Sequence, residues 1–166
     1  MSFKILLSID PALGQSRGGY ARSIKAEASE VLRRIQAPGI VPVVSLLACS
    51  DRVIRKLNRR WLGKDRPTNV ISFQSPEMSA AVKRLGPVPL RKGAIAGHLR
   101  GRRGEVFLGD IAVSVERAAA EAGRAGMDAR ERIARLVFHG IMHILGYTHR
   151  TMPDLCPAQK PASQRG

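Results

Sequence analysis

The chain has 166 residues, with 28 Lys or Arg against 13 Asp or Glu and a net charge of +15. This length suits one domain with a real hydrophobic core rather than several domains. The positive charge favours a polyanionic partner with a phosphate backbone. An anionic membrane is the competing partner, but the longest charge-free apolar stretch, Ile40 to Ser50, is too short to span a bilayer.

The first part of the chain alternates between strand and helix patterns. The apolar run from Phe3 to Ile9 is too brief for a signal peptide and ends at Asp10. We expect it to form a strand instead. Gly18 and Gly19 precede a helix expected from Tyr20 to Ala37. The β-branched run from Val41 to Ala48 predicts a buried strand.

The next elements follow in the same alternation. Ser50 or Asp51 can cap a short helix through Leu62, in which Trp61 is expected to face the core rather than to stack on a base. Asn69 to Phe73 reads as a short strand, held at its start by side-chain hydrogen bonds from Thr68 and Asn69. The remaining expected elements are a strand from Glu105 to Val115 interrupted by Gly109, a helix from Val115 to Ala125, and a helix from Arg130 to Leu145 after an Asp128 cap. This mixture predicts an α+β class: a single compact domain with a small mixed sheet packed with helices.

Two segments differ from the rest in composition. From Met78 to Gly104 there is no acidic residue but seven Lys or Arg, and repeated Pro and Gly predict a basic flexible loop that serves as an electrostatic arm for RNA. His98 in this segment is expected to be a solvated loop residue. The tail from Arg150 to Gly166 is expected to be disordered, so the domain would span residues 1–149.

Three of the four histidines form the pattern His-x3-His-x5-His at His139, His143 and His149. The first two are four residues apart, so they share one face of the predicted helix. Gly146 is a natural helix stop, after which the chain can turn back and bring the third histidine to the other two. Three neutral imidazoles at one point are the ligand set of a catalytic zinc site, with a fourth position for water.

The residue after the first histidine argues against a zinc peptidase. Zinc peptidases of the His-Glu-x-x-His type carry their general base there, whereas this chain has Gly140. Three neutral histidines without a carboxylate leave the double positive charge of the metal unneutralised. Such a site suits an anionic substrate such as a phosphodiester.

Four stretches of the sequence, taken in order, resemble the YbeY family of bacterial rRNA maturation factors, which are zinc-dependent, single-strand-specific endoribonucleases. The first is Leu57 to Phe73, with Gly-Lys-Asp-Arg-Pro-Thr-Asn-Val-Ile-Ser-Phe at its end; the others are Leu108 to Ser114, Glu121-Ala122, and the histidine motif from His139 to His149. The resemblance runs from about Phe3 to His149.

The resemblance implies one zinc ion per chain, held by His139, His143 and His149 on a helix distantly like that of zincin metalloproteases. It also implies that the protein trims precursor ends of ribosomal RNA, above all the 3′ end of the small-subunit 16S rRNA, and takes part in ribosome quality control. Its partners would be single-stranded RNA and the ribosome or its small subunit, while the oligomeric state stays open. Candidates for contacts to the reacting phosphate are Arg60, Lys64 and Arg66, each of which can equally be ordinary surface charge. Asp110 is a candidate for orienting a ligand histidine, although it can also cap a turn.

The chain departs from the family pattern at three places. Leu62 stands where the family usually has an Arg, Thr148 stands where an Asp is common, and the acidic helix that usually follows the third histidine is missing. These departures leave open a non-catalytic RNA- or ribosome-binding factor with a structural zinc. A zinc metallopeptidase is a third alternative, which Gly140 disfavours. The chain has only two cysteines, Cys49 and Cys156, in no metal-spaced pair, and we expect a reduced, cytoplasmic protein with Cys49 buried.

Overall fold

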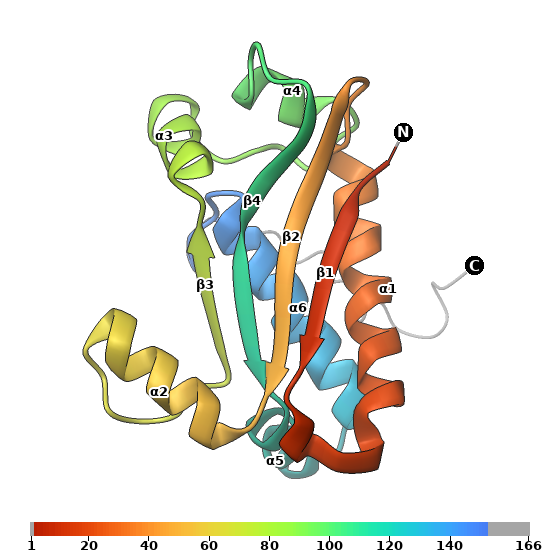
Figure 1. The fold of residues 1–166 in the computed structure, drawn as a ribbon, viewed down its shortest axis with the longest axis vertical. Helices are drawn as coiled ribbons and strands as arrows, with labels where there is room; N and C mark the ends of the chain where they lie inside the picture. Colours follow the sequence, from red (N-terminus) through yellow and green to blue (C-terminus); the bar gives the residue numbers. More distant parts are fainter. Residues whose placement is uncertain (1, 153–166) are drawn as a thin grey trace.

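A computed structural model of the chain describes residues 2–152. Its centre is a four-stranded mixed sheet in the order β1-β2-β4-β3 (Figure 1). The strands are β1 (Lys4–Ile9), β2 (Ile40–Cys49), β3 (Val70–Gln74) and β4 (Gly104–Ser114). The first, second and fourth strands are parallel, and β3 is antiparallel to β4. The predicted class, a single α+β domain with a mixed sheet, is confirmed.

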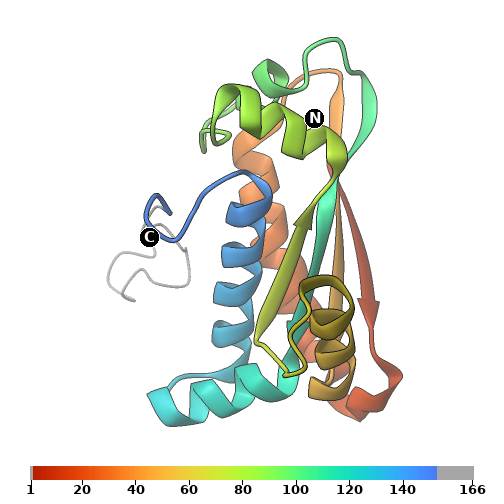
Figure 2. The same ribbon diagram turned by 90° about the vertical axis from the view of Figure 1, so that its left-hand side faces the viewer.

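Seven helical segments surround this sheet in the described part of the chain. They are η1 (Pro11–Ser16), α1 (Arg17–Ile35), α2 (Asp51–Leu62), α3 (Pro76–Leu85), α4 (Ala94–His98), α5 (Val115–Ala125) and α6 (Ala129–Ile144). Helices α1 and α6 cover one face of the sheet (Figures 1 and 2). None of the described helices has the length and apolar character needed to cross a bilayer.

The main core lies between the sheet and the α1–α6 layer. Its fully buried side chains include Leu32, Leu46, Leu108, Ile111 and Ile141, which come from both helices and from the two central strands. A second, smaller cluster lies on the opposite face, where Ile54 of α2 packs with Cys49, Ile71 and Ala112. The prediction that Cys49 is buried is therefore confirmed.

Two predicted features, one near the start of the chain and one in α2, are wrong. Helix α1 begins at Arg17, so Gly18 and Gly19 lie inside it rather than before it. Trp61 does not face the core: 60% of its surface is exposed, because it stands on the last turn of α2 and only reaches the edge of the sheet, where its ring centroid lies 6.0 Å from that of Phe73.

The segment expected to be a basic loop contains helices α3 and α4. Ser75 caps α3, because its side chain accepts a hydrogen bond from the Met78 amide, and Pro76 occupies the first turn. His98 is buried on α4 rather than solvated, and its Nε2 lies 3.0 Å from the Gly86 carbonyl oxygen. The expected disordered tail falls largely on residues 153–166, outside the described residues.

Strand β4 continues through Gly109 but is irregular there. The register against β2 shifts by one residue between Val43 and Val44, so β4 carries a bulge at this point. A Cβ at Gly109 would lie 2.2 Å from the Phe73 carbonyl oxygen, at a φ of 156°. Only glycine fits this position.

Candidate metal centre

Helix α6 places the first two histidines on one face of the molecule. Asp128 caps the helix by accepting hydrogen bonds from the amides of Arg130 and Glu131. The opposite side of the helix is apolar and packs into the main core, which fixes the rotation of the helix. As a result, the Nε2 atoms of His139 and His143 lie 3.0 Å apart.

The third histidine returns to this pair from the loop after α6. Gly146 has a φ of 94°, and the Tyr147 amide donates to the Met142 carbonyl, so the chain reverses within a few residues. The ring of His149 then lies 5.0 Å from that of His139 and 4.8 Å from that of His143, measured between centroids. The three predicted ligands are thus brought together.

The geometry of this triad fits a tetrahedral metal ion. One nitrogen of each ring lies within 4.8 Å of the others. Zn–N bonds of 2.0–2.1 Å in a tetrahedral site place two ligand nitrogens roughly 3.4 Å apart, so small ring rotations suffice. His143 Nδ1 lies 2.9 Å from the Tyr147 carbonyl oxygen, to which it donates, and this leaves its Nε2 free to bind a metal.

The protonation state of the histidines also suits metal binding. Burial, aided by the neighbouring His143, His149 and Arg132, lowers the pKa of His139 to about 4. Burial likewise lowers the pKa of His143, partly opposed by its hydrogen bond to Tyr147. Both rings are therefore neutral at pH 7, the form in which an imidazole binds a metal.

Gly140 is in close contact with the sheet. A Cβ at this position would lie 2.8 Å from Ile111 Cγ2, which is closer than real Cβ atoms approach other atoms. The glutamate that zinc peptidases carry after the first histidine would therefore clash with β4. The packing of α6 on the sheet requires glycine here.

Residues outside the histidine motif hold the third histidine in place. The Tyr147 hydroxyl donates to the Val88 carbonyl, and the Val88 amide donates to the Leu145 carbonyl. Gln74 on β3 donates from its side chain to the carbonyls of His143 and Ile144 at the end of α6. No spacing pattern in the sequence predicts these partners, because they come from β3 and from the segment expected to be a loop.

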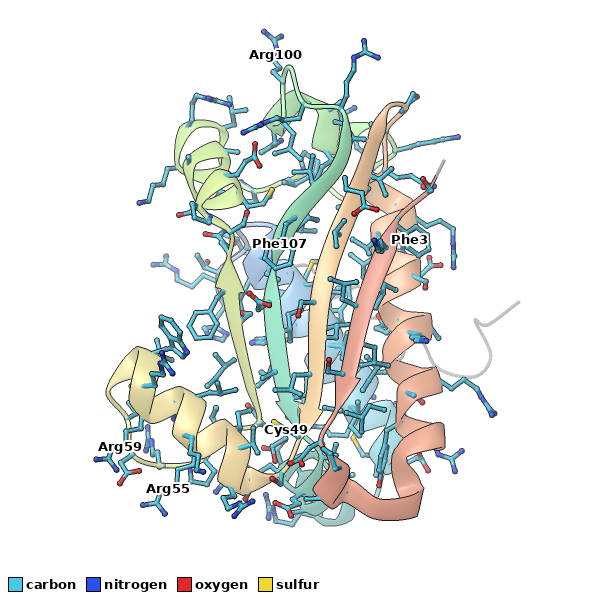
Figure 3. The ribbon with its side chains drawn as sticks, in the orientation of Figure 1. Phe3, Cys49, Arg55, Arg59, Arg100 and Phe107 are labelled. Atoms are coloured by element: carbon cyan, nitrogen blue, oxygen red, sulfur yellow. The ribbon has the colours of Figure 1, made fainter. Side chains whose placement is uncertain are left out.

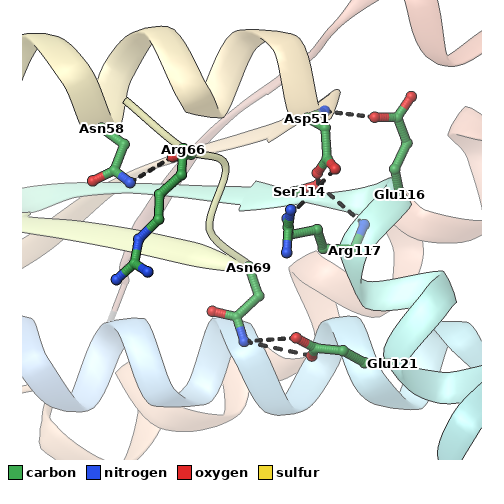
Figure 4. A network of polar contacts seen from close by, with 8 residues as sticks. All are labelled: Asp51, Asn58, Arg66, Asn69, Ser114, Glu116, Arg117 and Glu121. Carbon is green, nitrogen blue, oxygen red and sulfur yellow. Dashed lines mark hydrogen bonds and ion pairs between the residues drawn. The ribbon is translucent and has the colours of Figure 1, made fainter. Parts of the chain in front are cut away.

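A cationic groove adjoins the triad. It has a volume of about 510 Å³ and is lined by Leu62, Lys64, Arg66 and Arg117, among others, and by Ser72, which also borders the hollow that contains His143. Figure 4 shows how side chains hold the loop that forms it: Asn58 donates to the Arg66 carbonyl.

At the other end of this loop, Asn69 donates to Glu121 on α5. Glu121 in turn pairs with Arg132 on α6, at 2.6 Å. The predicted role of Asn69 in holding the loop is confirmed, and the groove is tied to the histidine helix.

The family model described as Endoribonuclease YbeY matches residues 15–156. The chain belongs to the YbeY family. An endoribonuclease YbeY of Methylocella silvestris is 34% identical over 67% of this chain and 50% of its own length. Another, of Paramagnetospirillum magneticum, is 34% identical over 74% of this chain and 64% of its own length, so the matched region spans about half to two thirds of these YbeY relatives. A solution structure of a Thermotoga maritima protein superposes with a TM-score of 0.44 and 18% identity over 90% of this chain and 75% of that chain.

The structure separates the other candidate residues of this YbeY chain into two groups. Lys64 and Arg66 line the groove beside the triad. Arg60 does not: its guanidinium lies over the Trp61 ring, 5.3 Å from the centroid. Asp110 lies on the opposite face of the sheet from α6, because its neighbour Ile111 is the residue that contacts Gly140. The thickness of the sheet therefore keeps the Asp110 carboxylate from the histidines it was expected to orient.

Proposed function

We propose that this chain is a zinc-dependent endoribonuclease that hydrolyses single-stranded RNA. We further propose that it acts in the cytoplasm, on the ribosome or its small subunit, in the maturation of the 16S rRNA 3′ end and in ribosome quality control. The observation that carries the proposal is the triad of His139, His143 and His149, whose ligand atoms lie within 4.8 Å, beside a groove lined by Lys64 and Arg66. Family membership and the net charge of +15 support it.

In this proposal the three histidines hold the metal, and the groove holds the RNA backbone. Zinc, when bound, supplies a Lewis acid and makes water available as a nucleophile near neutral pH. Lys64 and Arg66 neutralise charge on the phosphate, and Arg66 has a guanidinium that can donate two parallel hydrogen bonds to it. Within the described residues neither cation forms an ion pair, so both are available to the substrate.

A non-catalytic binding factor with a structural zinc is the second candidate, and Leu62 favours it. This side chain is 51% exposed in the groove, at the position where an arginine would contact phosphate. Such a factor keeps the positive groove but lacks one source of charge stabilisation in the transition state.

Cleavage of a labelled single-stranded RNA separates these candidates. The purified protein is tested with zinc, with a chelator, and as His143→Ala, and a duplex of the same sequence tests strand specificity. Cleavage that requires zinc and His143 supports the nuclease. RNA binding without cleavage, in a protein that contains one zinc per chain, favours the binding factor. Cleavage of an unfolded protein substrate instead would revive the peptidase.

A further inference from the structure

Residues 76–104 form a lobe, which we call the α3–α4 lobe, at the end of the molecule where α6 carries its histidines (Figures 1 and 2). The lobe is docked on the histidine loop: a Cβ at Gly146 would lie 2.5 Å from Val82 Cγ1, and Val88 exchanges hydrogen bonds with Leu145 and Tyr147. The lobe is therefore a fixed neighbour of the metal centre.

A pocket of about 730 Å³ lies between the end of α3 and α4. Three arginines line it, Arg84, Arg91 and Arg100, together with the buried His98. Two hydrogen bonds hold lining residues of the pocket in place. His98 Nε2 bonds to the Gly86 carbonyl, and Arg84 donates to the His98 carbonyl. The arginines thus surround a formed concavity, and Figure 3 shows Arg100 at the tip of the molecule.

The charge of this pocket has little compensation from the protein itself. The segment from Met78 to Gly104 contains no acidic residue, and within the described chain the lobe's one ion pair joins Arg102 to Glu77 at its base. Arg91 and Arg100 are exposed and form no ion pair among residues 2–152. A planar guanidinium matches phosphate oxygens in a bidentate geometry, so three arginines around one hollow suit a phosphate group.

We infer that the pocket lined by Arg84, Arg91 and Arg100 binds a backbone phosphate of the RNA, away from the bond that is cleaved. This inference rests on the proposed function, because it assigns a second contact to the same substrate. Helix α3 lies between the two sites: Ser79 borders the hollow of His143, and Arg84 borders the pocket five residues further along, about 7–8 Å along the helix axis and roughly 140° around it. An RNA strand that lies across the metal centre would pass around the end of α3 to reach the pocket.

The test compares the double variant Arg91→Gln/Arg100→Gln with a matched control, Arg22→Gln/Lys25→Gln. The control removes the same charge from exposed positions of α1 that lie outside both the groove and the pocket. Binding of a labelled single-stranded RNA of roughly twelve nucleotides is measured by anisotropy at several salt concentrations, in chelator so that no cleavage occurs. Cleavage of the same RNA and of a diribonucleotide is measured with zinc.

The inference predicts that the lobe variant loses several-fold more affinity than the control. The slope of log affinity against log salt should fall by roughly 0.7 for each lost phosphate contact, or about 1.4 for two. With zinc, the lobe variant should show a higher KM for the long RNA and an unchanged rate on the diribonucleotide, which is too short to reach the pocket.

Equal losses in the lobe variant and the control overturn the inference, because the arginines then act only through net charge. It is also overturned if the lobe variant keeps its RNA affinity but loses binding to vesicles that contain phosphatidylserine, since the pocket would then serve a membrane. If the wild type binds RNA without cleaving it, the proposed nuclease activity fails, while the binding comparison still decides the inference.

Discussion

Gly140 and Ile111 meet where helix α6 crosses strand β4, and the space between them holds a hydrogen atom but no side chain. A Cβ at Gly140 would lie 2.8 Å from Ile111 Cγ2 and 3.2 Å from its Cδ1. This contact sets the depth at which α6 lies on the sheet, and therefore the position of His139 and His143, which are one residue before and three residues after Gly140 on the same helix. The glycine of the motif thus has a packing role, which accounts for the absence of a peptidase glutamate.

The first prediction concerns this contact. Gly140→Ala should lower the free energy of unfolding by about 1–3 kcal/mol, because the added methyl group forces α6 away from β4. Gly123→Ala is the matched control: its Cβ would meet no atom within 4 Å, and alanine should stabilise α5 by about 0.5–1 kcal/mol. Denaturant unfolding of both variants tests this, and a neutral Gly140→Ala would show that the helix can shift freely.

The second prediction concerns Glu27, which is buried on α1 with no hydrogen-bond partner for Oε1 among the described residues. Burial raises the pKa of its carboxyl group to about 7 from 4.5. The folded state thus holds a proton that the unfolded state loses, so this contribution to stability is complete below about pH 4.5 and is lost as the pH rises through 7.

Glu27→Gln removes this titration. The variant should be more stable than the wild type at about pH 8 and close to it at about pH 4.5, as measured by urea unfolding. An equal difference between the two proteins at both pH values would mean that folding does not raise the pKa of Glu27.

The third prediction concerns the metal-free histidines. The pKa of His139 is lowered to about 4, mainly by burial, so the folded state disfavours its protonation. The stability of the metal-free protein should hold above about pH 6.5 and fall as the pH is lowered toward 4. Titration of the imidazole by NMR checks the value, and a midpoint near 6.5 for His139 would contradict the buried environment.

The fourth prediction concerns Leu62, which is half exposed in the cationic groove beside Lys64 and Arg66. Leu62→Arg places a guanidinium in the groove and should raise kcat/KM for RNA, by up to about tenfold if it contributes 1.4 kcal/mol in the transition state. Leu6→Arg adds the same charge at another exposed leucine, on β1 and outside both the groove and the pocket of the α3–α4 lobe, as a control. Equal gains in both variants would indicate a general charge effect.

The fifth prediction concerns the support of the third histidine. Tyr147→Phe removes the hydrogen bond to the Val88 carbonyl but keeps the ring, which should cost about 1 kcal/mol of stability and weaken zinc affinity. Tyr20→Phe changes the other tyrosine of the chain, on α1, and should leave zinc affinity unchanged. Zinc affinity measured by competition with a chelator would contradict this account if both variants matched the wild type.

Local patterns in the sequence were sufficient for most of the framework. The strand and the two helices that carry Val44, Ile54 and Ile141 follow the expected periodicities, and the His139–His143 spacing predicts the shared face that the structure has. The prediction of a flexible loop from Met78 to Gly104 is wrong, because it weighs the charges and glycines of the segment above a helix signal. That signal is Ser75-Pro76-Glu77 followed by apolar residues at helical spacing.

The remaining features depend on which faces the fold brings together. The placement of Asp110 away from the histidines follows from the alternation of β4, once Ile111 is known to face α6. The contacts of Tyr147 with Val88, and of Gln74 with the end of α6, join segments about 60 to 70 residues apart. Periodicity carries no information on such long-range pairs.

The central claim is that the three histidines form the metal centre of a nuclease. The most direct measurement is zinc content together with cleavage of single-stranded RNA, for the wild type and for His139→Ala, His143→Ala and His149→Ala. The account predicts about one zinc per wild-type chain, with zinc and cleavage lost together in each variant. Cleavage that persists in a variant without zinc, or in the presence of chelator, would contradict it.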